Sequence, residues 1–409
     1  MRKIYSFFLV AVCLFATSFA YAATRTVYFQ KPSQWADNVS VHIWGDGVGS
    51  NWDDDEISAS RDANTGLYYY TFDDDRYTKV IFRIKGVETA QTNDIIIEDG
   101  AVYTCMRNKK SNSWKLGTVD QFEFVYFDDF KSNWCAGHET LSNLEPCVYY
   151  FKDNDTGSTD WPGTELVYDN ELRCYKGFIL NNGRTFIFNN GMSDDDAEKN
   201  NKQQTGNLTD YNRINYYGGS FPLNVYAVGT IGPKGGNVVS WAPDNGDFKL
   251  SYTGSGVFEI KDIQMFINST IEETKTSFSA FRFHTKLAAW GEDSGTHYRP
   301  TEDKVLSVGT ASITTEVTTD GTGDKNWKVI TAEVDNSGNY FVYDLKLDLF
   351  NNKLTIDGSN HTTGVESISV EDSEAPVEYF NLQGVKVENP ENGLYIVRQG
   401  NKVRKQLIR

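Results

Sequence analysis

One ordered set of short segments occurs twice in the first half of this chain, and this repeat constrains the fold more than any other feature. Each copy holds an apolar triplet, a tryptophan, an alternating strand, a second apolar strand and a Gln-Thr pair. In chain order the pairs are Val27-Tyr28-Phe29 with Val125-Tyr126-Phe127, Trp35 with Trp134, Val41-His42-Ile43-Trp44 with Val148-Tyr149-Tyr150-Phe151, Val80-Ile81-Phe82-Arg83 with Phe186-Ile187-Phe188-Asn189, and Gln91-Thr92 with Gln204-Thr205. The offset grows from about 98 to about 113 residues, as expected for two copies of one fold with different loops.

The segments of the repeat predict β-structure. Each copy consists of short alternating runs broken by Asp, Asn and Gly, which is typical of an antiparallel β-sandwich. A third region, residues 223–357, shows similar alternation at larger spacing, and no stretch has a sustained helical periodicity. We therefore expect an all-β fold: tandem antiparallel β-sandwich modules and a small C-terminal β tail. The expected division is a signal peptide at 1–22, modules at 23–118, 119–220 and 221–358, a linker at 359–376 and the tail at 377–409.

The N-terminus predicts export. Arg2 and Lys3 precede an apolar run over residues 7–16, and Ala20-Tyr21-Ala22 gives a small-x-small cleavage pattern, so residues 1–22 are expected to be a signal peptide. No later stretch is apolar enough to cross a bilayer. The mature protein is expected to be secreted or to lie at the extracellular cell surface, without a membrane span.

Charge and composition narrow the class of partner. Residues 1–22 hold two of the 39 basic residues and none of the 56 acidic ones, so cleavage changes the net charge from −17 to −19. Such a charge repels nucleic acid, so we expect no nucleic-acid partner. Aromatic residues make up 14% of the chain, with nine Trp and 23 Tyr, a supply that sheets and sugar-binding faces use and long helices do not need.

The cysteines allow two disulfides in the mature chain. Cys105, Cys135, Cys147 and Cys174 remain after cleavage, and the sequence does not choose among their pairings. A hairpin bridge between Cys135 and Cys147 is the preferred hypothesis.

Several sequence features suggest a metal site or a catalytic site, but none has the spacing that such a site needs. The acidic runs at residues 53–56, 73–75 and 194–196 lack the spacing of a calcium-binding EF-hand loop. The five histidines are scattered, with no zinc-protease motif and no nucleophile elbow. Three binding-type modules leave no room for a catalytic barrel of about 250 residues. We expect no catalytic residue, no metal and no cofactor.

Strand alternation separates core aromatics from those free to bind. Val41 and Ile43 share one face of their strand, so His42 and Trp44 lie on the other. In the second copy the same rule turns Val148 and Tyr150 inward and leaves the outward pair Tyr149 and Phe151.

Each copy also carries a tryptophan in the loop that follows this strand, Trp52 or Trp161. An aromatic on a strand and another on the adjacent loop form a curved two-ring platform, on which the apolar C–H face of a pyranose stacks. Such a curve suits a helically twisted glucan better than flat cellulose. Gln91 and Gln204 supply amides for sugar hydroxyls, while packing in the core is the alternative role of each ring.

The second copy resembles carbohydrate-binding module family 26, a starch-binding β-sandwich family. The resemblance is carried, in order, by Val125-Tyr126-Phe127, Trp134, Val148-Tyr149-Tyr150-Phe151, Trp161-Pro162-Gly163, Phe188-Asn189-Asn190-Gly191 and Gln204-Thr205. It implies glucan contacts for the second copy at Tyr149, Phe151, Trp161 and Gln204, and for the first copy at His42, Trp44, Trp52 and Gln91. The first copy departs from the pattern, because Asn51-Trp52-Asp53 lacks Pro-Gly and Arg83-Ile84-Lys85-Gly86 replaces Asn-Asn-Gly, so we expect an altered ligand preference at the first site.

Two further resemblances cover the rest of the chain. Residues 223–357 loosely resemble the binding domains of the SusE/SusF starch-utilisation surface proteins, which implies glucan contacts at Trp241, Trp290 and Lys286. The tail, Tyr379-Phe380-Asn381-Leu382-Gln383-Gly384 onward, resembles the C-terminal sorting segments of Bacteroidetes secreted proteins, with a structural hairpin as the alternative. These resemblances imply secretion machinery or starch-utilisation surface proteins as partners.

Together these features predict a non-catalytic, exported protein that binds α-glucan, as starch or maltooligosaccharide, by aromatic stacking. The alternatives are a structural or adhesive surface protein that binds another glycan or a protein, and an accessory subunit of a starch-degrading complex.

Overall fold

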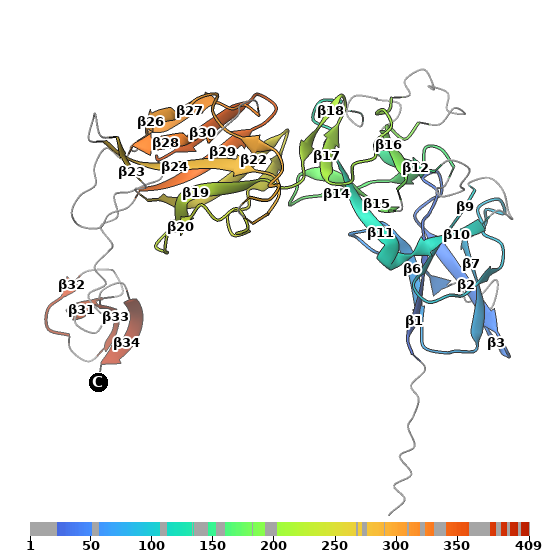
Figure 1. Ribbon diagram of the computed structural model, residues 1–409. Helices are drawn as coiled ribbons and strands as arrows, with labels where there is room; N and C mark the ends of the chain where they lie inside the picture. Colours follow the sequence, from blue (N-terminus) through green and yellow to red (C-terminus); the bar gives the residue numbers. More distant parts are fainter. Residues whose placement is uncertain are drawn as a thin grey trace, which may run out of the picture. The chain divides into compact units, whose positions relative to one another are not determined.

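The computed structural model describes the chain from residue 23 to residue 408 with gaps; the expected signal peptide lies outside it (Figure 1). The described residues are 23–50, 57–106, 113–132, 134, 146–152, 160–181, 183–192, 203–266, 269–271, 276–289, 291–308, 311–319, 324–330, 341–359, 377–381, 386–390, 393–399 and 402–408. Within them every regular element is a β-strand except one 3-10 turn, η1 (Val119–Gln121). The predicted all-β class is confirmed. None of the described segments forms a helix of the length and apolarity needed to span a membrane.

The chain divides into two compact units, residues 1–225 with 250–258, and residues 226–249 with 259–409. The first unit contains both copies of the repeat.

The first copy is a sandwich of two sheets. One sheet has the order β10 (Ser113–Thr118), β9 (Ala101–Cys105), β1 (Arg25–Phe29), β6 (Tyr68–Phe72), β5 (Ser60–Arg61). The other has the order β3 (Val48–Gly49), β2 (Val39–Gly45), β7 (Tyr77–Ile84), β8 (Ile95–Ile96), with β4 (Ile57–Ser58) also paired to β2. Apolar side chains from both sheets meet in one core, which includes Val27, Phe29, Val41, Ile43 and Phe82.

The second copy repeats this arrangement. Its larger sheet has the order β14 (Val167–Asp169), β15 (Cys174–Leu180), β11 (Phe122–Phe127), β17 (Arg213–Tyr216), β18 (Gly219–Pro222). Its smaller sheet has the order β13 (Thr164–Glu165), β12 (Cys147–Phe151), β16 (Thr185–Asn189).

The two copies match in strand register. Val41 of β2 faces Phe82 of β7, and Val148 of β12 faces Phe188 of β16. The first strand of each copy pairs in parallel with a later one, β1 with β9 and β11 with β17.

The Gln-Thr pairs match as well. The Thr92 hydroxyl accepts a hydrogen bond from the Phe82 amide at 3.0 Å, and the Thr205 hydroxyl accepts one from the Phe188 amide at 3.1 Å. Residues that correspond in sequence therefore occupy corresponding positions in the fold.

The copies are joined without a linker and share apolar surface. β10 ends at Thr118, η1 follows at once, and β11 begins at Phe122. The core of the second copy takes in Leu67, Val102 and Leu116 from the first copy. The two copies therefore pack as one body.

A twelve-stranded sheet occupies residues 226–357. Its main path is β26 (Lys304–Ser307), β28 (Trp327–Ile330), β24 (Thr276–His284), β19 (Tyr226–Pro233), β22 (Val257–Met265), β29 (Phe341–Asp348), β30 (Lys353–Asp357), β27 (Ser312–Glu316). The shorter strands β20 (Val239–Ser240), β21 (Ser251–Gly254), β23 (Ser269–Ile271) and β25 (His297–Tyr298) pair beside this path. Phe281, Phe283 and Trp327 are completely buried in its core.

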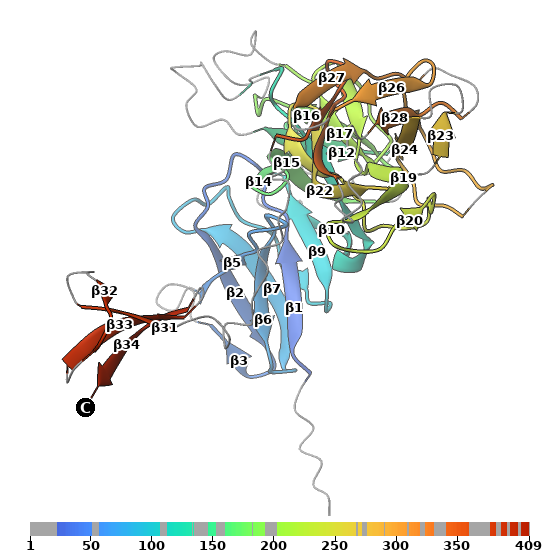
Figure 2. The same ribbon diagram turned by 90° about the vertical axis from the view of Figure 1, so that its left-hand side faces the viewer.

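The C-terminal residues form a separate sheet of the order β32 (Lys386–Val387), β31 (Val377–Phe380), β33 (Gly393–Gln399), β34 (Lys402–Ile408). Figure 2 shows β33 and β34 side by side, as does Figure 1.

Cys105, Cys147 and Cys174 are buried, and burial raises the pKa values of the Cys105 and Cys174 thiols far above their usual range. Cys135 lies outside the described residues, so its pairing with Cys147 stays a prediction.

Candidate functional site

Three aromatic rings gather on the outer face of the smaller sheet of the second copy. Along β12, Val148 and Tyr150 are completely buried, while Tyr149 and Phe151 are half-buried on the opposite face. The centroids of the Tyr149 and Phe151 rings are 5.7 Å apart, and the ring planes make an angle of 30°. The centroids of the Tyr149 ring and the half-buried Trp161 ring are 5.4 Å apart, and their planes make an angle of 58°. The tilt between Tyr149 and Trp161 gives a bent surface of two partly exposed rings, which we call the Tyr149–Trp161 platform.

The Trp161 ring is held through its own polar atom. The indole Nε1 donates a hydrogen bond to the Met192 carbonyl at 2.9 Å. The bond fixes the edge of the ring, and the ring remains partly exposed.

The loop behind Trp161 is held by a buried amide. The Asn189 side chain is fully buried, and it donates to the Pro162 carbonyl at 2.8 Å and accepts from the Gly191 amide at 2.9 Å. The Trp161-Pro162 bond is cis.

Gly163 is required by space as well as by conformation. Its φ is 99°, and a Cβ there would lie 2.0 Å from the Val148 carbonyl oxygen. Only glycine lets the loop approach β12 this closely.

Gln204 lies at the edge of this arrangement. It forms an antiparallel bridge with Asn189, the residue that holds Pro162, and its side chain is exposed. An exposed amide can donate to and accept from hydroxyl groups.

The first copy brings together a different pair of rings. His42 and Trp44 stack with centroids 5.0 Å apart at 28°, and the Lys79 ammonium lies 5.9 Å from the centroid of the Trp44 ring. His42 Nδ1 is hydrogen-bonded to the Ser50 hydroxyl at 2.9 Å. Burial, and then the positive charge of Arg83, lower the pKa of His42, so its ring is neutral at pH 7.

The same sheet position carries different chemistry in the two copies. By register, His42 corresponds to Tyr149, Trp44 to Phe151, and Arg83 to Asn189. Gln91 is bridged to Arg83 as Gln204 is to Asn189. Trp52, the expected loop ring of this copy, lies outside the described residues.

In the third region the two candidate tryptophans are not both described. Trp241 is half-buried in a left-handed conformation, with φ 48°, and the Arg282 guanidinium lies 5.5 Å from the centroid of its ring. Arg282 Nη1 also donates to Asp324 at 2.9 Å. The Lys286 ammonium lies 3.7 Å from a carboxylate oxygen of Asp293. Trp290 lies outside the described residues.

The site geometry includes supporting groups that sequence reasoning did not identify. The sequence shows the Asn-Asn-Gly turn as a motif, but it gives no sign that Asn189 is the buried support of Pro162. Neither the Met192 carbonyl nor its contact with Trp161 carries any sequence signal. No group of three or more His, Cys, Asp or Glu residues suited to a metal ion occurs among the described residues.

Comparison with known proteins gives matches to glucan-binding modules. Residues 27–96, from β1 to β8, match the family model of starch-binding module 26, CBM26. The comparison with curated proteins finds no match.

Among solved structures the chain is similar to CBMbc, of family CBM26, from Eubacterium rectale Amy13K in complex with maltoheptaose. The identity is 16%, over 45% of this chain and 85% of that chain, with a TM-score of 0.18. It is also similar to family 41 carbohydrate-binding modules from streptococcal virulence factors, at 17% identity over 46% of this chain and 89% of that chain, with a TM-score of 0.16. These TM-scores are low, so the sandwich fold described above rests on the sheets and cores of this chain. The segment spanning residues 27–96 is thus similar to the starch-binding modules of family 26.

Proposed function

We propose that this chain is a non-catalytic protein that binds α-glucan through its tandem sandwich modules. The observation that carries the proposal is the Tyr149–Trp161 platform, two partly exposed rings tilted by 58° with the exposed amide of Gln204 near the loop. Because the copy that contains it matches the first copy in register, the family match over residues 27–96 supports the same function for both.

The site residues of this proposal are those that each module turns outward. In the second copy they are Tyr149, Phe151, Trp161 and Gln204, and in the first copy His42, Trp44, Trp52 and Gln91. Trp241 and Trp290 are the proposed contacts of the third module. The module limits at 23–118, 119–220 and 221–358 belong to the same proposal.

Stacking on such rings gives weak binding per module. A ring that removes roughly 60–80 Å² of sugar from water contributes about 1.5–2 kcal/mol. A few hydrogen bonds add about 0.5–1.5 kcal/mol each and must offset the entropy of association. A single module is expected to bind in the millimolar to tens-of-micromolar range. Modules that engage one polymer together can gain a factor of about 10²–10⁴, which gives the tandem arrangement its use.

Export and sorting are part of the proposal. We propose that residues 1–22 direct secretion and that the sheet β31–β34 is a sorting tail, as in the secreted Bacteroidetes proteins that its sequence resembles. The proposed place of action is the cell surface or the medium outside it, where polymeric α-glucan is met. Secretion machinery and starch-utilisation surface proteins are the proposed partners.

Affinity electrophoresis tests the proposal. The mature protein and the Trp161→Ala variant are run through gels that contain amylopectin or dextran. Retardation by amylopectin alone, reduced in the variant, is the expected result. Free migration of the wild type in both gels would contradict α-glucan binding and favour the adhesive alternative.

A further inference from the structure

The segment that follows the first strand of copy one reaches into copy two. Gln30 comes directly after β1 and is 4% exposed. Its backbone is fixed to its own copy, since its amide donates to the Tyr103 carbonyl and its carbonyl accepts from the Thr104 hydroxyl, both at 2.8 Å.

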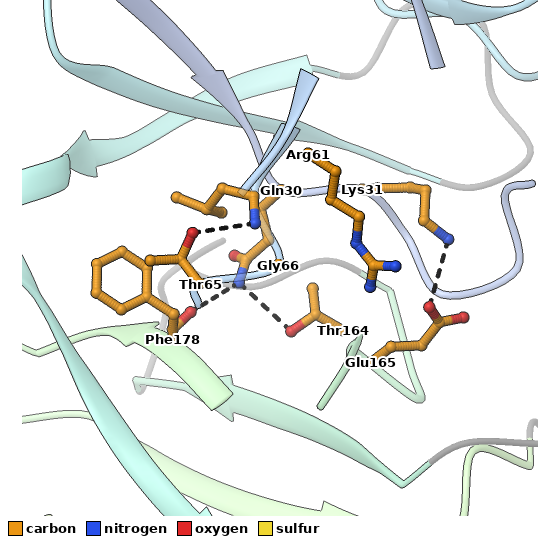
Figure 3. Close-up of a pocket in the computed structure, with 9 residues that line it drawn as sticks. Gln30, Lys31, Arg61, Thr65, Gly66, Thr164, Glu165 and Phe178 are labelled. Atoms are coloured by element: carbon orange, nitrogen blue, oxygen red, sulfur yellow. Dashed lines mark hydrogen bonds and ion pairs between the residues drawn. The ribbon is translucent and has the colours of Figure 1, made fainter. Parts of the chain in front are cut away.

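The Gln30 side chain is bonded entirely to the second copy. Its Oε1 accepts a hydrogen bond from the Tyr150 hydroxyl at 2.5 Å. Its Nε2 donates to the Phe178 carbonyl at 3.1 Å and lies 3.4 Å from the Thr164 hydroxyl oxygen, as Figure 3 shows. One amide therefore ties together β12, which carries Tyr149, and the start of β13, which follows Trp161.

Lys31 makes a parallel connection. Its side chain is 5% exposed, and its ammonium lies 3.7 Å from Glu165 and 3.5 Å from Asp37 (Figure 3 draws the first pair). Its Nζ also donates to the Trp35 carbonyl at 2.5 Å. The buried ammonium of Lys31 therefore pairs with a carboxylate of each copy, Asp37 of the first and Glu165 of the second.

The contacts converge on the residues just after Trp161-Pro162. The Ser33 amide donates to the Gly163 carbonyl at 3.3 Å, Gln30 reaches Thr164, and Lys31 reaches Glu165. Gly163, Thr164 and Glu165 are consecutive, and each contacts copy one. Within its own copy the same segment pairs with β12, Thr164 with Val148 and Glu165 with Cys147, so the contacts from copy one add to this pairing.

The space at this junction is too small for a sugar. The cavity lined by Gln30, Lys31, Thr164, Glu165 and their neighbours has a volume of about 20 Å³, room for about one water molecule. The contact is therefore structural, and its effect on a ligand must pass through the loop that it holds.

We infer that the first copy completes the ligand site of the second, with Gln30 and Lys31 as positioning residues for the Trp161 loop. This inference rests on the proposed function. Neither residue touches the ligand; both fix where Gly163–Glu165, and hence the Trp161 ring, lies relative to Tyr149. The glucan site of the second copy is thus built from both copies.

The test uses the full mature chain carrying Trp44→Ala, which removes a proposed ring of the first site. Into this background go Gln30→Leu, which loses the amide at similar volume, and Glu165→Gln, which loses the charge paired with Lys31. Leu116→Ala is the matched control, because Leu116 lies in the shared core and has no contact described with residues 163–165. Maltoheptaose affinity is measured by calorimetry and the melting temperature by circular dichroism.

Gln30→Leu and Glu165→Gln are expected to weaken maltoheptaose binding about three- to tenfold. Leu116→Ala is expected to lower the melting temperature and to leave the affinity unchanged. If the junction only stabilised the fold, affinity and melting temperature would instead change together in all of these variants. Tyr150→Phe should reproduce the Gln30→Leu effect and add nothing to it in the double variant. Unchanged affinity in Gln30→Leu and Glu165→Gln, with binding abolished by Trp161→Ala, would overturn the inference and leave the proposed function standing. If the chain with both copies intact binds no maltoheptaose, both fail.

Discussion

Gln30 and Asp128 occupy the same position in the two copies, and each is bonded to the chain that follows its own copy. Both come directly after the first strand, and their amides donate to the corresponding carbonyls of Tyr103 and Asn215 at 2.8 and 2.7 Å. Both are 4% exposed. Gln30 bonds to copy two, while Asp128 Oδ2 accepts from the Ser255 amide at 2.7 Å and from the Tyr252 hydroxyl. Residues 250–258 belong to the same compact unit as both copies. Within this unit the residue after the first strand therefore connects each copy to the segment that follows it: Gln30 connects copy one to copy two, and Asp128 connects copy two to residues 250–258.

Replacing Asp128 should therefore destabilise the first unit. In Asp128→Asn one carboxylate oxygen becomes an NH₂ group, so the donors of Tyr252 and Ser255 lose an acceptor. The expected cost is about 1–3 kcal/mol of unfolding free energy, measured by urea denaturation. Asp120→Asn, at an exposed position of η1, is the control and should stay within about 0.5 kcal/mol of the wild type. Equal stabilities of the two variants would contradict the role given to Asp128.

Removing the Tyr149 ring should weaken glucan binding while leaving the fold intact. Tyr149→Ala loses about 1.5–2 kcal/mol of stacking, which corresponds to about a 10- to 30-fold higher Kd for maltoheptaose. Tyr149→Phe keeps the ring and should change the Kd less than about threefold. Tyr168→Ala, an exposed ring on β14 of the other sheet, is the matched control. Calorimetric titration in the Trp44→Ala background measures all three, and a Tyr168→Ala effect as large as that of Tyr149→Ala would argue against a local platform.

Adding one methyl group at Gly163 should disrupt the loop that carries Trp161. With φ at 99° and the Val148 carbonyl 2.0 Å from the added Cβ, Gly163→Ala must displace either the loop or β12. We expect a loss of stability of at least about 1 kcal/mol together with weaker maltoheptaose binding. Gly206→Ala, where nothing lies within 4 Å of the added Cβ, is expected to be neutral in both measurements. Wild-type affinity in Gly163→Ala would show that the position of the loop does not matter.

The stability of the second unit should fall in mild acid. Burial lowers the pKa values of His284 and His297, and the nearby charge of Arg282 lowers them further. Above the unfolded value of about 6.5 both states are neutral and the stability is complete. As the pH falls below this value, the two histidines are protonated in the unfolded state before they are protonated in the folded state. The free energy of unfolding therefore decreases until the pH lies below the pKa values of the folded state.

Melting temperatures between pH 8 and pH 5 check this expectation. His284 Nδ1 bonds to the Lys286 carbonyl at 2.9 Å, and His284→Asn keeps a donor near that place without a titrating group. The variant is expected to melt lower at pH 8 but to lose less stability toward pH 5. A pH profile parallel to that of the wild type would exclude His284 as a source of the acid sensitivity.

The parts of this molecule that follow from local pattern were predictable from its sequence. The alternation in Val148-Tyr149-Tyr150-Phe151 indicates which side chains face the core, since period two is a property of the strand itself. The paired Gln-Thr segments likewise indicated a repeated fold. Whether the outward residues bind glucan stays a prediction.

The supports of the loop were not predictable. Gln30 and Lys31 follow a strand and are polar, which is typical of an exposed loop, but the Gln30 side chain bonds to the second copy and the Lys31 ammonium contacts both copies. Asn189 is polar within a strand pattern for a similar reason: its partner, Pro162, is 27 residues away in sequence. Partners that depend on tertiary packing leave no mark at the position itself.

The shared core sets the smallest piece of this protein that can be transplanted. A cut between Thr118 and Val119 would uncover Leu67, Val102 and Leu116, which are at most 9% exposed in the intact chain. An isolated first copy would expose an apolar patch at the surface that contacts the second copy in the intact chain. A fragment used as an affinity tag should therefore keep both copies together with residues 250–258, which supply the partners of Asp128.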